Sequence, residues 1–211
     1  MTKATLLNKS FWFLFWSFII GLSVFFYVTT ILDYSYGYIP ENFKRGFWDS
    51  KIWFICHIVG ASAALLLGPL QFWPKFRTRF IRYHRAAGKI FIFGSLLAAV
   101  GAFRINLMYD CVACRYSLGI LSVIWFFVTA AAWWAIKNKN VKAHRQFMIR
   151  SYTASLAFVF IRISSILPFN PYPFIDDRTQ QRITSEWLCW VIPFMVIELY
   201  MVWLPSLRKR I

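Results

Sequence analysis

The sequence predicts an all-α integral-membrane protein, and three observations lead to this prediction. Of the 211 residues, 59% are hydrophobic, 21% are aromatic and only 15% are charged, whereas a soluble domain carries roughly 25% charged residues. Apolar runs recur along the chain at the length that an α-helix needs to cross a bilayer, about 20 residues. The formal net charge of +16 comes mostly from basic residues that lie between these runs.

Six apolar runs are long enough to cross a membrane, and they leave no room for a separate soluble domain. We therefore predict one membrane domain, residues 1–211, built as a polytopic bundle of six transmembrane helices. The first run follows Lys3 and Lys9, exceeds the apolar core of a signal peptide and lacks an Ala-x-Ala cleavage site, so we predict that it is retained. The predicted spans lie near residues 11–32, 53–73, 90–109, 116–136, 147–167 and 187–206.

The basic residues predict how the bundle is oriented. With the N-terminus inside, the inner segments hold sixteen Lys and Arg residues and the outer loops hold six. Cytoplasmic segments carry the excess of Lys and Arg, so both termini should be cytoplasmic. Because the basic residues lie between apolar runs and no soluble domain could carry them as a patch, we predict no nucleic-acid partner.

Two of the three histidines open predicted spans at the cytoplasmic edge: His84 begins the third and His144 begins the fifth. Two neutral imidazoles on facing helices suit haem iron or another transition metal. We predict that they hold haem b, with Arg85 and Arg145 close enough to pair with its propionates. The alternative interpretation is that both histidines are solvated in basic turns near the lipid headgroups. No other metal site is predicted.

A second group of cations falls in the outer half of the predicted bundle: His57, Arg104 and Arg162. Buried arginine is costly in lipid and normally finds a partner or a wet cavity. No carboxylate inside the spans shares their depth, so this group predicts an outer anion site for a haem propionate, a quinone or a lipid phosphate. The alternative is that Arg104 snorkels to Asp110, and Arg162 to the loop at 176–177.

Cys111 and Cys114 occupy the short outer turn between the third and fourth spans. A disulfide is the first interpretation in an oxidising compartment, and a redox or copper-binding pair is the alternative. The turn supplies only two of the four ligands that structural zinc needs. Glu198 is the only acidic residue inside a span, and we predict that it pairs with Arg150 as a helix-packing salt bridge.

Three motifs occur in order over roughly residues 50–165. The first runs from His57-Ile-Val-Gly to Gly-Pro-Leu-Gln-Phe at 68–72, the second is Tyr-His-Arg at 83–85 with Gly-Lys at 88–89, and the third is Ala-His-Arg at 143–145 with Met-Ile-Arg-Ser-Tyr at 148–152. Together they resemble a bacterial integral-membrane family known as domain of unknown function 2306. The resemblance implies a multi-span protein of the bacterial inner membrane with no established activity.

The spacing from His84 to Gly88 is also similar to the surroundings of haem ligands in transmembrane b-type cytochromes. Those proteins usually carry four ligand histidines for two haems. This chain has three histidines in all, so at most one bis-histidine haem is available to it.

These features predict a multi-pass membrane protein that binds haem b or another metal between its helices for electron transfer, as a component of a membrane oxidoreductase if it is an enzyme. The alternative is a transporter or accessory subunit that binds a lipid or an anionic solute through buried Arg and His. Expected partners are the bilayer, a membrane-protein complex or a second copy, and a quinone, lipid or small anion. Walker, Rossmann, nucleophile-elbow and H-E-x-x-H motifs are absent, which disfavours soluble-type nucleotide or hydrolase chemistry.

Overall fold

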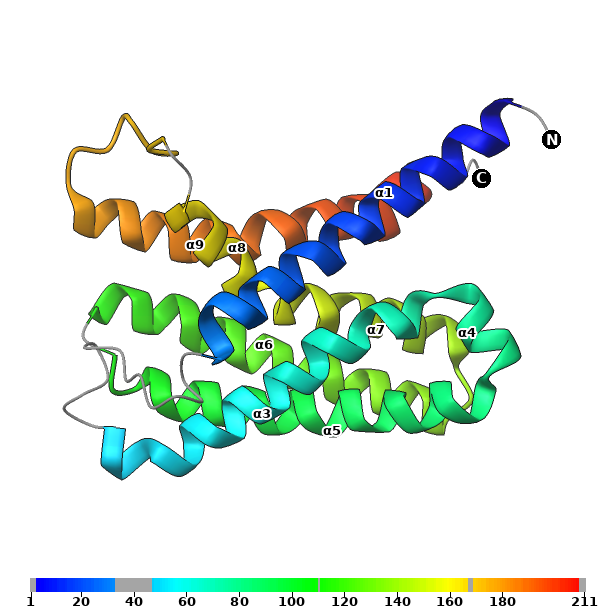
Figure 1. Ribbon diagram of the computed structural model, residues 1–211, viewed down its shortest axis with the longest axis horizontal. Helices are drawn as coiled ribbons and strands as arrows, with labels where there is room; N and C mark the ends of the chain where they lie inside the picture. Colours follow the sequence, from blue (N-terminus) through cyan, green and yellow to red (C-terminus); the bar gives the residue numbers. More distant parts are fainter. Residues whose placement is uncertain (1–2, 33–46, 110, 167–168, 209–211) are drawn as a thin grey trace.

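The structure, a computed structural model, describes residues 3–32, 47–109, 111–166 and 169–208, and these form helices joined by short turns, with no strand among them (Figure 1). At 3–9, 30–31, 47–49, 162–166 and 208 it describes the backbone only. The elements are α1 (Lys3–Phe26), η1 (Tyr27–Ile31), α3 (Phe47–Phe72), α4 (Pro74–Arg79), α5 (Ile81–Asn106), α6 (Val112–Lys137), α7 (Val141–Ser155), α8 (Ala157–Ile166), α9 (Arg178–Glu198), η3 (Leu199–Trp203) and α10 (Leu204–Arg208). The all-α prediction is confirmed.

Four helices form the centre of the molecule. α3 and α6 each pack against both α5 and α7, so α5 and α7 occupy opposite corners of the four-helix group. α1 crosses over α3 and α8, while α9 lies against α6, α7 and α8 (Figure 1). This arrangement matters for function because a ligand held jointly by α5 and α7 would lie inside the bundle.

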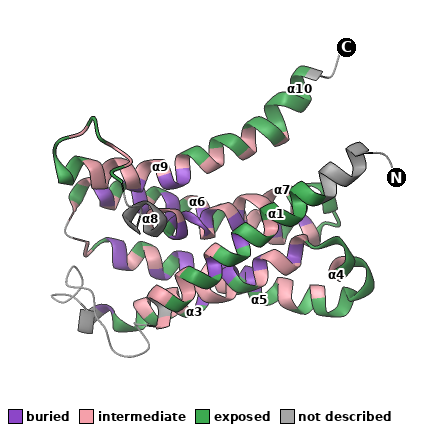
Figure 2. Ribbon diagram, turned by 45° about the horizontal axis from the view of Figure 1, so that its top comes forward, coloured by how far each residue is buried: buried purple, intermediate pink, exposed green. Residues whose placement is uncertain are grey.

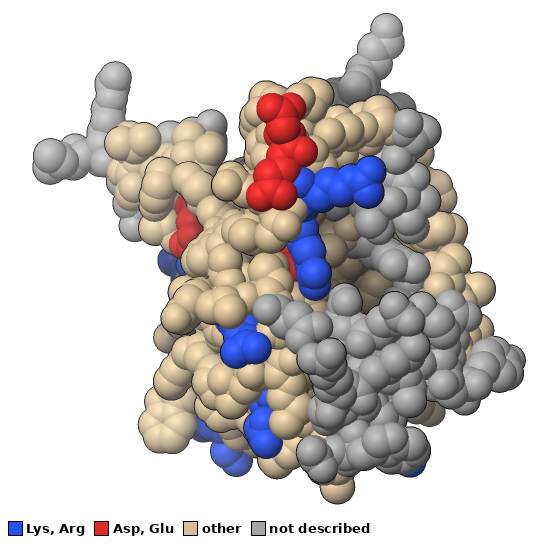
Figure 3. All heavy atoms as spheres, turned by 90° about the vertical axis from the view of Figure 1, so that its left-hand side faces the viewer, with Lys and Arg blue, Asp and Glu red and all other residues tan. Residues whose placement is uncertain are grey.

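The two ends of the bundle differ in what they carry. One end, called here the α4 end, holds α4 and the turn at 138–140 between α6 and α7; the start of α1 and the end of α10 lie toward this side in both ribbon views (Figures 1 and 2). The other end, called here the disulfide end, holds the turn at 107–111 and the loop at 169–177. Figure 3 looks onto the disulfide end and shows acidic and basic side chains grouped in its upper part.

Five of the described helices are long and apolar enough to cross a membrane: Ser10–Thr29, Ser50–Phe72, Ile81–Asn106, Val112–Lys137 and Arg178–Leu207. These match five of the six predicted spans. The remaining prediction, 147–167, falls on two shorter helices, α7 and α8, because the helix is interrupted at Leu156. Five candidate spans are therefore established by length and composition.

Several segments predicted as loops are helical, because side chains cap their first turns. The Asp177 carboxylate accepts from the Thr179 N–H at 2.9 Å, which starts α9 well before its apolar run. The Asn140 side chain accepts from the Ala143 N–H at 3.0 Å and starts α7. Such caps satisfy N–H groups that the helix itself leaves unpaired. α7 and α9 therefore begin before the predicted spans at 147–167 and 187–206.

Small residues bring α3 and α5 into close contact. A Cβ on Gly60 would lie 2.3 Å from the Gly94 carbonyl oxygen, and a Cβ on Gly101 would lie 2.6 Å from the Trp53 carbonyl oxygen. Helices inside a membrane have little hydrophobic drive to associate and rely on close packing of small residues instead. The interface between α3 and α5 is built this way.

The outer surface of the described bundle is apolar. Large hydrophobic side chains stand exposed along α1, where Phe13 is 72% exposed and Phe18 is 62% exposed. Figure 2 shows exposed residues along the outward side of α1 and along α10. A soluble monomer rarely exposes continuous apolar surface of this extent. A bilayer would cover it.

Candidate functional site

The α4 end contains a cluster of buried or half-buried polar side chains, called here the α4-end cluster: Gln71, His84 and His144. His84 comes from α5 and His144 from α7, the two helices at opposite corners of the bundle. The two imidazoles lie within electrostatic range of one another. The structure therefore brings together the two histidines that the sequence singled out.

The ring of His144 is held in one orientation. Its Nδ1 lies 2.8 Å from the Ala132 carbonyl oxygen on α6. A carbonyl oxygen only accepts hydrogen bonds, so Nδ1 carries the proton and donates it. Nε2 of the neutral ring then keeps its lone pair, which is the usual arrangement of a histidine that binds a metal.

His84 and Gln71 carry polar atoms that are buried without a partner. His84 Nδ1 and Gln71 Nε2 have no hydrogen bond within the described part of the chain. Gly88, one turn after His84, lets Gln71 lie against α5, since a Cβ there would be 3.0 Å from Gln71 Oε1. An unpaired buried polar atom costs about 1–3 kcal/mol. Unpaired atoms gathered beside two histidines mark a candidate ligand site.

The arginines within electrostatic range of His84 include one that was predicted, Arg85, and one that was not, Arg77. Arg85 and Arg145 are both exposed, and Arg85 lies within electrostatic range of His84. Arg77, on α4, is also within electrostatic range of His84 and is less exposed. Arg77 was not among the residues that the sequence predicted for this site. The signal that could have found Arg77 is Pro74, because proline is favoured in the first turn of a helix.

The predicted outer group is only partly described. His57 Nδ1 donates to the Ala98 carbonyl oxygen on α5 at 3.0 Å, and the ring contacts Phe158 at a centroid distance of 6.2 Å. These contacts place His57, on α3, against both α5 and α8. Arg104 is half-buried on α5. The Arg162 side chain and Asp110 lie outside the described residues.

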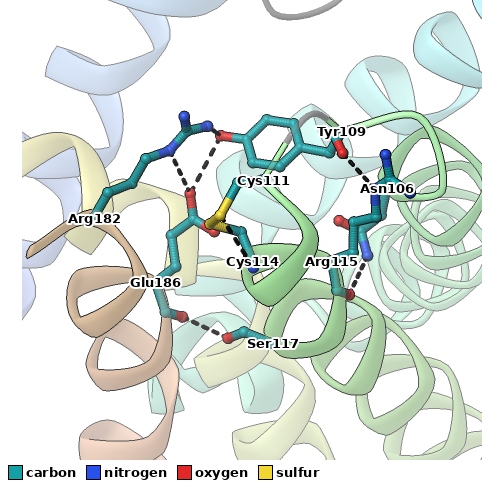
Figure 4. The surroundings of a disulfide bond; sticks show 8 residues. All are labelled: Asn106, Tyr109, Cys111, Cys114, Arg115, Ser117, Arg182 and Glu186. Atoms are coloured by element: carbon teal, nitrogen blue, oxygen red, sulfur yellow. Dashed lines mark hydrogen bonds and ion pairs between the residues drawn. A yellow bond between two sulfur atoms is a disulfide. The ribbon is translucent and has the colours of Figure 1, made fainter. Parts of the chain in front are cut away.

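A second polar cluster lies at the disulfide end and is called here the Glu186 cluster: Tyr109, Arg182 and Glu186 (Figure 4). The Tyr109 hydroxyl donates to Glu186 Oε1 at 3.2 Å, and Arg182 Nε lies 3.3 Å from the same oxygen. Arg182 Nη2 also donates to the Tyr109 hydroxyl, and its guanidinium sits 4.6 Å from the centre of the Tyr109 ring. Burial, and then the Glu186 charge, raises the pKa of the Tyr109 phenol, so it stays protonated.

The disulfide of Cys111 and Cys114 lies beside this cluster. Cys111 caps the N-terminus of α6, and the Arg115 guanidinium donates to the Tyr109 carbonyl oxygen across the turn. The sequence pointed to the cysteines but not to the Glu186 cluster. The available signal was a single glutamate at the start of an apolar run, with an arginine one turn earlier.

The sequence also predicted that Glu198 pairs with Arg150, and this pairing is present. Arg150 Nε and Nη2 contact the two Glu198 oxygens at 2.5 and 2.8 Å. The fork-shaped contact joins α7 to α9, and such bidentate pairs are among the stronger polar contacts in proteins.

Ser117 joins α6 to α9 through two hydrogen bonds. Its hydroxyl donates to the Glu186 carbonyl oxygen at 2.9 Å and accepts from Trp190 Nε1 at 2.9 Å. We expect Ser117→Ala to lower the free energy of unfolding by about 1–3 kcal/mol, because it leaves the buried indole N–H unpaired. Thermal unfolding in detergent would measure this, with Ser122→Ala as the control, since the Ser122 hydroxyl donates to the Leu118 carbonyl oxygen on its own helix. Equal losses in the two variants would contradict the prediction.

The chain matches a family model described as "Predicted membrane protein (DUF2306)" over residues 54–201. This range includes the four central helices except for the start of α3, together with the histidines of the α4-end cluster, the disulfide and Glu186. No curated protein and no solved structure shows a significant match to the chain. With more than half of its length matched by that model, and with five apolar helices long enough to cross a bilayer, the chain belongs to the DUF2306 family of membrane proteins.

Proposed function

We propose that this protein binds haem b between α5 and α7 and serves as an electron-transfer component in the membrane. The observation that supports this proposal is that His84 on α5 and His144 on α7 both lie at the α4 end, within electrostatic range of one another. Two imidazoles placed in this way are a typical ligand pair for a b-type haem. A bound haem would supply one-electron oxidation and reduction at its iron.

The residues around His84 and His144 have the chemistry that a haem b would require. His144 would offer Nε2, because Nδ1 is already bonded to the Ala132 carbonyl oxygen. His84 has a buried ring nitrogen that no described residue satisfies. Arg77 and Arg85 place positive charge near His84, where it would attract propionates. The chain itself thus holds the ligand nitrogens and supplies compensating charge.

We also propose a topology for the whole chain: six crossings, with both termini and the α4 end in the cytoplasm of a bacterial inner membrane. Between Lys75 and Lys89, and between Lys137 and Arg150, the chain carries eleven basic residues and no acidic one. The α4 end holds both of these segments. Positive charge of this density is typical of the cytoplasmic side. In this topology α7 and α8 together make the fifth crossing.

An absorption spectrum of the purified full-length protein, expressed with ample haem precursor, tests the haem proposal. A Soret band should be present in the parent protein and absent from His84→Ala and from His144→Ala. His57→Ala is the matched control, since His57 also bonds a backbone carbonyl from inside the bundle. It should keep the band.

Three outcomes would count against haem binding: a colourless parent protein, a band that persists in both single variants, or a band lost only in His57→Ala. The rival function, binding of a lipid or small anion, predicts a colourless protein whose melting temperature rises with anionic phospholipid. Arg104→Ala should then reduce that rise.

A further inference from the structure

We propose that the Cys111–Cys114 disulfide is redox-active, exchanging with a dithiol partner, and that Glu186 carries the proton for Cys114. This site lies at the opposite end of the bundle from the α4-end cluster and does not depend on haem binding. The partner is defined by its chemistry: a protein or small molecule with two thiols that can form a disulfide.

The two cysteines differ in access. Cys114 is 0% exposed, whereas Cys111 is partly exposed at the start of α6. An incoming thiolate can therefore reach the sulfur of Cys111 and not that of Cys114. The Cys114 N–H donates to Cys111 Sγ at 3.2 Å, and a helix N-terminus favours negative charge. Both features would stabilise a thiolate on Cys111, as in other C-x-x-C sites.

Glu186 is held alongside this disulfide. Its carbonyl oxygen accepts from Ser117, three residues after Cys114 on the same face of α6. Its carboxylate accepts from Tyr109, two residues before Cys111. The Glu186 side chain therefore runs between these two contacts, which flank Cys111 and Cys114 in the sequence, and Figure 4 shows Glu186 among the surroundings of the disulfide.

One carboxylate oxygen of Glu186 is free of the hydrogen bonds described above and could pass a proton to Cys114. Tyr109 and Arg182 both contact Oε1, while Oε2 is buried without a hydrogen bond in the described part of the chain. The residue is only 4% exposed. Burying an unsatisfied carboxylate oxygen is costly, and a neighbouring thiol that gains and loses a proton would give that oxygen a partner.

The reaction balances in two steps. A partner thiolate attacks Cys111 Sγ, the bond between the two sulfurs breaks, and Cys114 leaves as a thiolate, which receives a solvent proton passed to it by Glu186. The partner's second thiolate then attacks the mixed disulfide and releases Cys111 as a thiolate. The partner dithiol becomes a disulfide, the protein gains two electrons, and the reverse sequence reoxidises it.

The test uses full-length protein in detergent, with the free cysteines Cys56 and Cys189 replaced by Ser and Ala. The protein is equilibrated with mixtures of reduced and oxidised dithiothreitol, quenched in acid and labelled with a thiol-reactive polymer that shifts its gel mobility. We expect reversible gain and loss of two labels while intrinsic fluorescence shows the folded state. A disulfide that opens only when the protein unfolds would overturn the proposal.

The role of Glu186 is tested by the rate of reduction. Glu186→Gln should slow it by about 100-fold, the lower end of what a positioned acid or base contributes. Glu198→Gln, which alters a carboxylate bonded to Arg150 instead, should leave the rate unchanged. Equal rates in the two variants would overturn the proton-carrier role.

If Glu186→Gln fails to fold, Tyr109→Phe tests the same role while keeping the carboxylate. It removes one hydrogen bond to Oε1 and should shift the pH profile of the reduction rate. A profile that coincides with that of the parent protein would contradict the proposal.

Discussion

Gly60→Ala is expected to lower the free energy of unfolding by about 3 kcal/mol, at the upper end of what overpacking costs. The new methyl group would lie 2.3 Å from the Gly94 carbonyl oxygen and 3.1 Å from the Ala98 Cβ. The first of these atoms is helix backbone and cannot move aside as a flexible side chain would. α3 and α5 must therefore separate, which weakens the most extensive helix pair in the bundle.

Gly21→Ala is the matched control. Gly21 also lies in a membrane helix, yet a Cβ there would have nothing within 4 Å. Alanine favours helix over glycine by about 1 kcal/mol, so this variant should be as stable as the parent or slightly more so. Thermal unfolding of both variants in the same detergent measures the difference. A Gly60→Ala protein that melts with the parent would show that α3 and α5 do not pack as described.

The second large effect is expected at the ion pair between Arg150 and Glu198. Arg150→Met should destabilise the protein by about 3–5 kcal/mol, because it leaves a carboxylate unpaired inside the membrane. The Arg150 side chain is 14% exposed and that of Glu198 is 30% exposed, and nearby exposed side chains of α9, such as Met195 and Val196, are apolar. Glu198→Leu should have a similar effect, since it leaves the guanidinium unpaired.

The double variant, Arg150→Met with Glu198→Leu, distinguishes the effect of the ion pair from the effect of changing the size and shape of the two side chains. It should be more stable than either single variant, because no charge remains unpaired. The coupling energy from the four proteins measures the interaction. Losses that simply add would mean that the two residues stabilise the protein independently of each other.

The membrane helices could be predicted because a crossing has a fixed length and needs an apolar surface. Five predicted spans correspond to single long helices. The exception, at 147–167, kept its apolar composition but is interrupted at Leu156, where the N–H is shared between the Tyr152 and Thr153 carbonyl oxygens. No glycine or proline marks that position, so local sequence offered no sign of the break.

The polar sites were predictable to different degrees. His84 and His144 stood out because histidines are rare in this chain, and the Arg150–Glu198 pair followed from depth along two helices. The Glu186 cluster could not be predicted, because Tyr109 and Glu186 are 77 residues apart and meet only through the packing of α9 on α6. A contact of that kind depends on which helices are neighbours, and apolar runs alone do not specify this.

The division between α7 and α8 bears on how the protein is made. α8 has 10 residues and α7 has 15, or about 15 and 22 Å of helix, so neither alone matches a hydrocarbon core of about 30 Å. α7 is tied to its neighbours by polar bonds, to α6 through Ser151 and Thr129 and to α9 through Arg150. Until α9 has been synthesised, α7 and α8 lack the ion pair between Arg150 and α9 and, of the polar bonds just named, have only the one to α6. Their lasting insertion therefore depends on the helix synthesised after them.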